Sequence, residues 1–263
     1  MIEACEEVSN DAQVVEDCRV WLLKQKQTQD WRTSKATADA IYGLLLRGGD
    51  ILASDALVEV ALASKPIKPE KAEAGPGFYE RTFVRDEIKS AMGQITVTKV
   101  DEGISWGRVH WQYLEDIVKV TPHEGTPLKL NKTLFIKDTT GKGQVLKPVT
   151  GPVSVGDELV ACIELHTDRD MEFIHLKDQR GSGTEPVNVL SQYKYQDGLA
   201  YYETTRDTAS HFFIDYLPKG VYVFEYSLRI QLKGHYQTGL AEIQCMYAPE
   251  FNSHSESITL EVR

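Results

Sequence analysis

The residues best suited to chemistry in this chain are an acidic cluster and two histidines that lie near carboxylates. Asp168, Asp170 and Glu172 could supply oxygen ligands to a calcium ion. An EF-hand loop also needs a glycine at its sixth position and a glutamate at its twelfth, and neither spacing is present here. A solvated turn with an internal pair between Arg169 and an aspartate explains the cluster better, so we predict no metal site.

The two histidines are candidates for general-base catalysis. His175 precedes Asp178 by three residues, and His211 precedes Asp215 by four. In strands these spacings do not bring both side chains to one site, as they would in a helix. A nucleophile and an orienting group would also have to converge, and no activated-serine motif is present. The sequence therefore predicts no catalytic residue, no cofactor-binding residue and no cofactor.

The four cysteines give no sign of a metal site either. Cys5, Cys18, Cys162 and Cys245 form neither a C-x-x-C pair nor a cluster with histidine. We expect them to be small, buried apolar side chains, Cys162 above all because it lies in a predicted strand. A disulfide between Cys5 and Cys18 stays open, because spacing alone does not fix connectivity.

Composition argues against two classes of function. The 263 residues are 41% apolar, which is enough for the packed cores of one large or two ordinary domains. A formal net charge of −10 argues against the basic surface that nucleic acid requires, so we expect no nucleic-acid partner. No apolar run approaches the roughly 20 residues that span a bilayer, and the N-terminus lacks a signal-peptide pattern.

The elements that would position these residues begin with a short N-terminal helical hairpin. Asp11 is typical of a helix cap, and after it six residues recur at helical spacing, namely Val14, Val15, Cys18, Trp21, Leu22 and Gln25. Thr33 or Ser34 could cap a second helix, whose stripe would comprise Ala36, Ala40, Ile41, Leu44 and Leu45. Gly48 and Gly49 would end that helix in a left-handed turn.

From about residue 55 the pattern changes to short strands. Alternation predicts strands at residues 57–62, 95–98 and 108–113, with a long loop from Lys65 to Gly77 between the first two. Residues 121–127 form a linker. An antiparallel sandwich should follow, with strands near residues 128–137, 158–166, 171–176, 201–205, 211–216, 221–232 and 240–247. Asp197-Gly198 predicts a hairpin, and residues 218–220 predict a tight reversal.

Aromatic residues concentrate between residues 193 and 226. Phe212, Ile214 and Tyr216 alternate with Phe213, Asp215 and Leu217, so one of the two sets should pack into a sandwich core. Four tyrosines could instead mark an exposed contact surface, namely Tyr193, Tyr195, Tyr201 and Tyr202.

Several segments resemble the C-terminal portion of bacterial alpha-2-macroglobulin-like proteins, in order along the chain. Residues 169–178, 212–226 and 243–256 resemble blocks of the terminal domain of that family. Residues 95–99 and 111–113, with Trp106-Gly107, resemble the region just before it. Residues 21–27 and 35–38 resemble the last helices of the thioester-carrying helical domain. About 50 helical residues are also too few to form a core of their own, which predicts a piece of a larger protein.

The resemblance implies a mainly β fold in three parts. Residues 1–52 would be the end of a helical, thioester-type domain, residues 53–124 a partial CUB-like β-sheet, and residues 125–263 a C-terminal macroglobulin-like antiparallel β-sandwich. The C-x-E-Q type motif of the family thioester is absent from this sequence, because Cys162 is followed by Leu165 where glutamine is required.

The resemblance also implies a function. Family members trap attacking proteases, so the chain would be non-catalytic and would act as an intramolecular interface that holds or releases the helical domain. Its partners would be other domains of the same polypeptide, with proteases as targets of the parent protein. The parent would be exported, to the periplasm or to a membrane anchor outside this chain. Unpaired edge strands of the partial sheet could also pair between two copies.

Two other hypotheses remain open from the sequence. A stand-alone carbohydrate- or surface-binding sandwich would use the exposed tyrosines, and a planar row of exposed rings would favour it. A hydrolase with an unrecognised acid pair would need two carboxyls in one cleft, and nothing in the sequence singles out such a pair.

Overall fold

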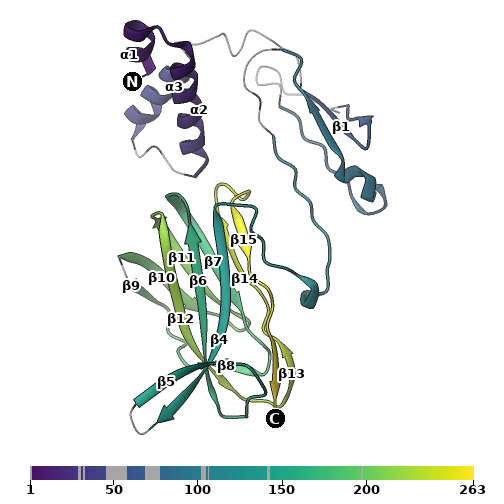
Figure 1. Cartoon of the computed structure of the whole chain (residues 1–263), viewed down its shortest axis with the longest axis vertical. Coiled ribbons are helices and arrows are strands. Elements are labelled where there is room, and N and C mark those ends of the chain that lie inside the picture. Colours follow the sequence, from purple (N-terminus) through teal and green to yellow (C-terminus); the bar gives the residue numbers. More distant parts are fainter. Residues whose placement is uncertain are drawn as a thin grey trace. The chain divides into compact units, whose positions relative to one another are not determined.

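The computed structural model describes residues 2–28, 31, 33–45, 58–68, 78–101, 105, 107–140, 143–196 and 198–263. Contacts divide the chain into two units, one formed by Met1–Leu23 and Trp31–His110 and the other by Lys24–Asp30 and Trp111–Arg263. The helices and a small sheet fall mainly in the first unit, and a β-sandwich forms the second (Figure 1).

The N-terminal part forms helices at the positions that the caps predict. A short helix α1 (Ile2–Ala4) continues into a π-helical turn (Cys5–Ser9), followed by α2 (Ala12–Thr28) and α3 (Ser34–Leu45). The carboxylate of Asp11 accepts hydrogen bonds from the backbone N–H groups of Gln13 at 3.1 Å and Val14 at 3.2 Å. Thr33 caps α3 through the N–H of Ala36 at 3.1 Å. Gly48 and Gly49 lie outside the described residues.

The buried face of α2 differs from the predicted stripe. Val15 and Arg19 are buried, and the guanidinium of Arg19 donates to the backbone carbonyl of Leu44 at 2.9 Å, near the end of α3. This contact satisfies a carbonyl that the helix end leaves without an intrahelical partner. Trp21, by contrast, is 60% exposed. On α3, Ala40 is buried, but three apolar side chains are exposed, namely Ile41, Tyr42 and Leu45.

A small antiparallel sheet has the strand order β2-β1-β3. Its strands are β1 (Glu59–Leu62), β2 (Lys65–Pro66) and β3 (Ile95–Thr98). The predicted strands at β1 and β3 are confirmed, and β2 forms where a loop was expected. Single 3₁₀ turns occur at Arg85–Glu87, Ser90–Gly93 and Ile117–Lys119.

The predicted strand at residues 108–113 is wrong. These residues form no ladder, and their apolar members Val109, Trp111 and Tyr113 are 63%, 48% and 69% exposed. Alternation specifies a strand only where a neighbouring strand covers one face and completes the hydrogen bonds. In the described part of the chain, no strand pairs with this segment.

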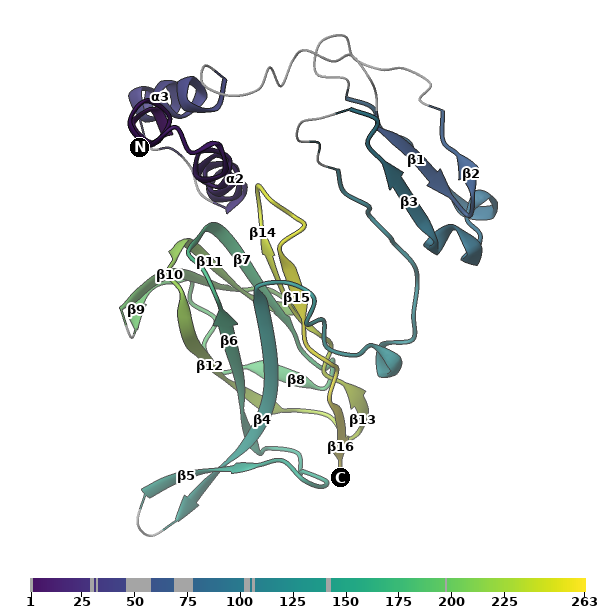
Figure 2. The same cartoon turned by 45° about the horizontal axis from the view of Figure 1, so that its top comes forward.

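The sandwich packs two antiparallel sheets face to face (Figure 1, Figure 2). The six-stranded sheet has the order β15-β14-β7-β11-β10-β9, and the five-stranded sheet has the order β5-β4-β6-β12-β8. The six-stranded sheet comprises β7 (Met171–Gln179), β9 (Gln192–Gln196), β10 (Leu199–Thr205), β11 (Ala209–Leu217), β14 (Ala241–Cys245) and β15 (Asn252–His254). The five-stranded sheet comprises β4 (Leu128–Thr140), β5 (Gly143–Pro148), β6 (Glu158–Thr167), β8 (Thr184–Pro186) and β12 (Gly220–Ile230).

All seven predicted sandwich strands are present, within a few residues of their predicted ends. The strands that the sequence missed are β5, β8, β9 and β15, together with β13 (Gly234–Gln237) and β16 (Thr259–Val262), which pair as a separate ribbon. All six contain at most six residues, too few for alternation to stand out. The predicted hairpin at Gly198 joins β9 to β10. The reversal at residues 218–220 instead carries the chain from one sheet to the other.

The core lies between the two sheets. Leu130 and Ile163 from the five-stranded sheet and Ile174 and Ile214 from the six-stranded sheet belong to one buried cluster. Aromatic rings cross the same interface, because Phe224 on β12 lies 5.2 Å from Phe212 on β11, measured between ring centroids. Burial of such large apolar surfaces is the main stabilising contribution to a sandwich.

Two adjacent strands break the predicted alternation at matching positions. On β7, Met171 and Ile174 are both buried although they lie three residues apart, which a regular strand does not allow. Phe173 accounts for this, because its φ of 57° turns the backbone and leaves its side chain outside. On β11, Ile214 and Leu217 are likewise both buried. The predicted grouping of Tyr216 with Phe212 and Ile214 is therefore wrong, and Tyr216 is 39% exposed.

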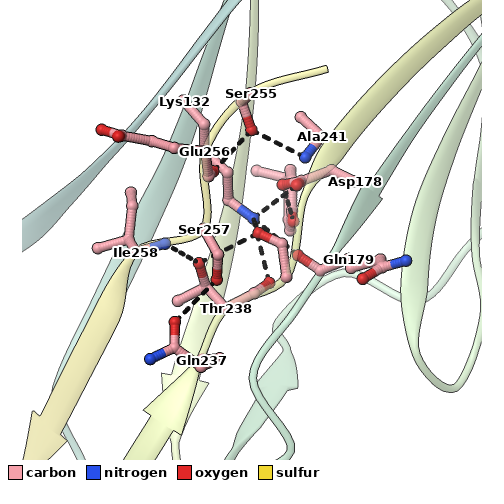
Figure 3. A network of polar contacts seen from close by, with 12 residues as sticks. Lys132, Asp178, Gln179, Gln237, Thr238, Ala241, Ser255, Glu256, Ser257 and Ile258 are labelled. Atoms are coloured by element: carbon pink, nitrogen blue, oxygen red, sulfur yellow. Dashed lines mark hydrogen bonds and ion pairs between the residues drawn. The ribbon is translucent and has the colours of Figure 1, made fainter. Parts of the chain in front are cut away.

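A buried ion pair links the two sheets (Figure 3). The ammonium of Lys132 on β4 lies 2.6 Å from the carboxylate of Asp178 on β7, and both side chains are at most 1% exposed. The same ammonium donates to the backbone carbonyls of Gln179 at 2.7 Å and Thr238 at 3.2 Å. The second carboxylate oxygen of Asp178 accepts a hydrogen bond of 2.6 Å from the hydroxyl of Tyr226 on β12.

Burial raises the pKa of the Asp178 carboxyl, while Lys132 and Tyr226 act in the opposite direction. Burial also raises the pKa of Tyr226 well above its ordinary value. Its hydroxyl therefore stays protonated and donates a hydrogen bond to Asp178. Each charged atom of the pair therefore has hydrogen-bond partners. This satisfies the condition under which a buried ion pair is tolerated.

A second set of hydrogen bonds fastens the C-terminal segment beside this pair (Figure 3). The hydroxyl of Ser255 accepts from the N–H of Ala241 at 3.0 Å, and the hydroxyl of Thr238 accepts from the N–H of Ile258 at 3.2 Å. Thr238 also supplies its carbonyl to Lys132. The connection between β15 and β16 is thereby tied to the one between β13 and β14.

We predict that Lys132→Met will lower the free energy of unfolding by about 3–5 kcal/mol, because it leaves the Asp178 carboxylate buried without its cation. Lys137→Met is the matched control on the same strand. Its partner Glu158 lies at 2.8 Å in a pair that is about one-quarter exposed, so the loss should be about 1 kcal/mol or less. Urea denaturation of both variants measures the difference. Equal losses would contradict a special role for Lys132.

We also predict that glycine will be more stable than alanine at position 173, which is the reverse of the usual order in a strand. Phe173→Gly and Phe173→Ala both remove the ring, but only glycine adopts the positive φ without strain. The glycine variant should therefore be the more stable by about 1 kcal/mol in urea denaturation. At Gln244, in the neighbouring strand β14, the same two substitutions should show the ordinary order, with alanine more stable. An alanine variant as stable as the glycine variant at position 173 would show that the strain is absent.

Candidate interaction surface

The acidic cluster lies at the connection between β6 and β7, where protein groups engage two of its carboxylates. Arg169 pairs with Asp168 at 2.9 Å, as the sequence predicts. Asp170 accepts hydrogen bonds from the hydroxyl of Tyr216 at 2.7 Å and from the N–H of Lys219 at 2.8 Å. These two bonds, the backbone one first, lower the pKa of the Asp170 carboxyl. Within the described ranges, no group of three or more histidines, cysteines or acidic residues is arranged to hold a metal ion.

The two histidines meet each other instead of their sequence neighbours. His175 on β7 and His211 on β11 both face outward from the six-stranded sheet, and their ring atoms Nε2 and Nδ1 lie 2.9 Å apart. Asp178 points into the core. Sequence reasoning missed this pair because β7 and β11 are adjacent in space but separated by three strands in the chain. Only the register of that pairing could have revealed it.

A row of side chains crosses the outer face of the six-stranded sheet at the level of His175. The cross-strand partners in order are Gln244 on β14, His175 on β7, Phe213 on β11, Tyr202 on β10 and Tyr193 on β9. We call the last four residues the aromatic row. Each directly opposite pair in an antiparallel sheet places its side chains on the same face, so the four rings form a continuous surface feature.

The aromatic row contains two pairs of rings in contact. His175 and Phe213 are parallel within 3° with centroids 4.6 Å apart, and Tyr202 and Tyr193 lie 4.9 Å apart at a tilt of 58°. Tyr193 at the edge of the sheet is 80% exposed and Phe213 is 36% exposed, whereas His175 and Tyr202 are partly buried. Because His175 and Phe213 stack, one face of each of these two rings is covered by the other ring.

Phe173 and Tyr247 extend the apolar surface beyond β7. Their rings meet edge to face with centroids 5.0 Å apart, and they are 40% and 79% exposed. The positive φ of Phe173 is what turns this ring outward. Backbone strain of this kind persists only where the surroundings hold it, which makes Phe173 a position of functional interest.

The predicted set of exposed tyrosines is partly wrong. Tyr193 and Tyr195 are 80% and 77% exposed, but Tyr201 is buried in the core, where it packs edge-on against Phe224. The intervening Lys194 on the edge strand β9 points inward and pairs with buried Glu203 on β10. An inward charge of this kind protects an edge strand against pairing with other chains.

Charged groups surround the histidine pair. Burial lowers the pKa of His175, Lys177 adds to the shift, and Glu242 opposes it. Burial also lowers the pKa of His211, with the charges of His175, Lys177 and Arg206 acting in the same direction. Lys177 and Glu242 form an ion pair of 3.3 Å across β7 and β14. Both imidazoles therefore favour the neutral state at neutral pH.

The cysteines differ from the prediction. All four are free, including Cys5 and Cys18. Cys245 is buried as expected, but Cys162 is only partly buried on β6. Burial raises the pKa of Cys162, and the nearby carboxylates of Glu225 and Glu164 act in the same direction, so its thiol stays protonated.

Solved structures similar to this chain include alpha-2-macroglobulins from two bacteria. Trypsin-activated alpha-2-macroglobulin from Escherichia coli matches 100% of this chain and 18% of its own length, with 13% identity and a TM-score of 0.48. Salmonella alpha-2-macroglobulin reacted with methylamine matches 55% of this chain and 10% of its own length, with 18% identity and a TM-score of 0.42. This chain therefore spans less than one-fifth of either structure.

A curated protein from Dictyostelium discoideum, circularly permutated Ras protein 2, is 24% identical over 106 residues. The matched part is 40% of this chain and 3% of that protein. Pairing of edge strands between two copies stays a prediction. None of the helices in the described part of the chain is long and apolar enough to cross a membrane.

A family model matches residues 128–250, and its description is the bacterial alpha-2-macroglobulin MG10 domain. The match begins at the first residue of β4 and ends just after β14, so it contains ten of the eleven strands of the two sandwich sheets, all except β15. The C-terminal portion of this chain is an alpha-2-macroglobulin-like β-sandwich of the bacterial MG10 type.

Proposed function

We propose that this chain is a non-catalytic part of a bacterial alpha-2-macroglobulin-like protease-trapping protein. In this proposal the sandwich is an intramolecular interface that holds the helical domain of the same polypeptide and releases it when a protease attacks. The observation that carries the proposal is the aromatic row on the outer face of the six-stranded sheet, extended by Phe173 and Tyr247.

The aromatic row has the character of a protein-binding surface. Tyrosine and phenylalanine provide large contact areas at low entropic cost, and tyrosine adds a hydroxyl that can form a hydrogen bond at a wet interface. Polar and charged groups border the rings, including Gln244 in the same row and Lys177 and Glu242 beside it. This combination of an apolar centre with a polar rim is typical of an interface that must also survive in water.

The helices support a helical partner for such a surface. Taken by themselves, α2 and α3 leave several large apolar side chains exposed, with Trp21 at 60% and Leu45 at 52%. Helices of this kind need another apolar surface to cover them. A helical domain of the parent protein that ends in such helices would therefore supply the apolar complement that the aromatic row requires.

Three further assignments belong to this proposal. Residues 1–52 would end the helical domain, residues 53–124 would be a partial CUB-like sheet, and residues 125–263 the terminal domain. Proteases would be targets of the parent protein, and the parent would be exported. The two histidines contact each other, and Asp178 is engaged by Lys132 and not by His175.

A carbohydrate-binding function is less well supported. Sugar-binding sandwiches stack aromatic faces on the ligand, so they need ring faces that are open to solvent. In the aromatic row, His175 and Phe213 cover each other and Tyr193 is tilted by 58° against Tyr202. The rings do not form a flat platform.

We predict that Phe213→Asp and Tyr193→Asp, introduced separately into the full-length protein, will abolish a protease-dependent change in hydrogen exchange. In the wild-type protein, β9 and β10 should be protected before protease treatment and should exchange faster after it. Either aspartate places a charge in the interface and weakens it. The exchange rates of β9 and β10 before and after protease treatment should then be equal. Mass spectrometry of peptides from residues 192–205 measures the exchange.

Val221→Asp is the matched control, because Val221 is a 57% exposed apolar residue on β12, in the opposite sheet. It should retain the wild-type change. Tyr193 is 80% exposed, so its replacement should not disturb the core. An effect of the Tyr193 variant can therefore not be ascribed to misfolding. If the wild-type β9 and β10 exchange at the same rate before and after protease treatment, the sandwich does not act as a releasable interface.

A further inference from the structure

We propose that His175 and His211 form a proton-sensitive lock on the aromatic row. The pair holds the row in place while at least one imidazole is neutral, and it loosens the row once both are protonated. This inference concerns the sandwich alone and does not require that a partner binds it.

The first step of the argument is the distance between the two rings. Nε2 of His175 and Nδ1 of His211 lie 2.9 Å apart, and the rings are parallel within 6°. At that separation one ring donates its N–H and the other accepts it with a lone pair. Because both nitrogens of an imidazolium carry hydrogen, the doubly protonated pair would direct two N–H groups and two positive charges at each other. That state cannot keep this geometry.

The second step is the connection between the pair and the row. Phe213 stacks on His175 at 4.6 Å and is itself the cross-strand neighbour of Tyr202, which contacts Tyr193 at 4.9 Å. His211 lies on the same strand as Phe213, with ring centroids 6.3 Å apart. Separation of the two imidazoles therefore removes the surface on which Phe213 rests, and the change extends along the row toward β9.

The third step is the set of charges around the pair. Lys177 lies beside it on β7 and directly opposite His211, while Arg206 precedes β11. Glu242 on β14 opposes them but is engaged by Lys177 at 3.3 Å. Asp215 follows on β11, and β10 places Tyr202 and Thr204 opposite Phe213 and His211. The nearby cations and partial burial thus make the second proton costly to add.

The sign of the pH effect follows from the direction of the shifts. The folded-state pKa values of both histidines are lowered, first by burial, so the unfolded chain binds more protons than the folded one at mildly acidic pH. The stabilisation is fully present above the ordinary histidine pKa of about 6.5. It is lost as the pH falls through that value toward the lowered pKa values of the folded pair.

The test is a pH titration of the chain by histidine ¹⁵N NMR, combined with urea denaturation at about pH 7.5 and about pH 5. In the wild type the two imidazoles should titrate as a coupled pair in two steps, and the ring signals of Phe213 should follow the second step. His211→Asn places an uncharged amide where Nδ1 lay, so His175 should then titrate in a single step. Acidification should lower the ratio of folded to unfolded protein in both proteins. The factor by which this ratio falls should be at least about threefold larger for the wild type than for this variant.

His166→Asn is the matched control, since His166 is an exposed histidine on β6 in the opposite sheet. It should leave both the coupled titration and the acid sensitivity at wild-type values. The proposal is overturned if the two histidines titrate independently at their ordinary pKa, or if the Phe213 signals do not follow them. It is equally overturned if His211→Asn and His166→Asn have the same effect. None of these results would depend on whether the row binds a helical domain.

Discussion

The contact between Lys132 and Asp178 is the constraint on which the sandwich depends. It joins β4 to β7 through the core, and Tyr226 adds β12 to the same carboxylate. Apolar packing between two sheets is not directional, so it tolerates small shifts of one layer over the other. A buried charge with several defined hydrogen-bond partners does not, because any shift leaves a charge or a carbonyl without a partner. The pair therefore fixes the relative register of two layers that apolar residues hold together.

This constraint also positions the surface on the opposite face of the same strand. Asp178 lies on β7 three residues after His175, and one faces the core while the other faces solvent. Anchoring β7 at Asp178 thus sets the position of His175 against His211 on β11. The core fixes the positions of the strands that carry the aromatic row. The rings can therefore be well ordered without a bound partner.

The sequence predicted the sandwich well and its surface poorly, and the difference has a physical cause. β12 is long and its burial alternates regularly, and β6 is a long and mainly apolar run, so the sequence pattern reveals both. The placement of Tyr216 failed because the left-handed turn at Phe173 and the matching break on β11 lie outside any simple period. The sequence failed to predict the contact between His175 and His211 for another reason. The contact depends on which strands become neighbours, and that information lies in the tertiary fold and not in local spacing.

Asp170 gives the sandwich a mechanical property. The chain crosses between the sheets after β6 and again after β11, among other places, and the Asp170 carboxylate accepts hydrogen bonds from Tyr216 on β11 and from Lys219 in the crossing after β11. A single carboxylate thereby latches the two crossings at one end of the sandwich, while Lys132 resists sliding within it. The two sheets should behave under load as one stiff block. A force applied to either sheet would be transmitted to the segments that lead into the sandwich, and shape changes would be confined to those segments.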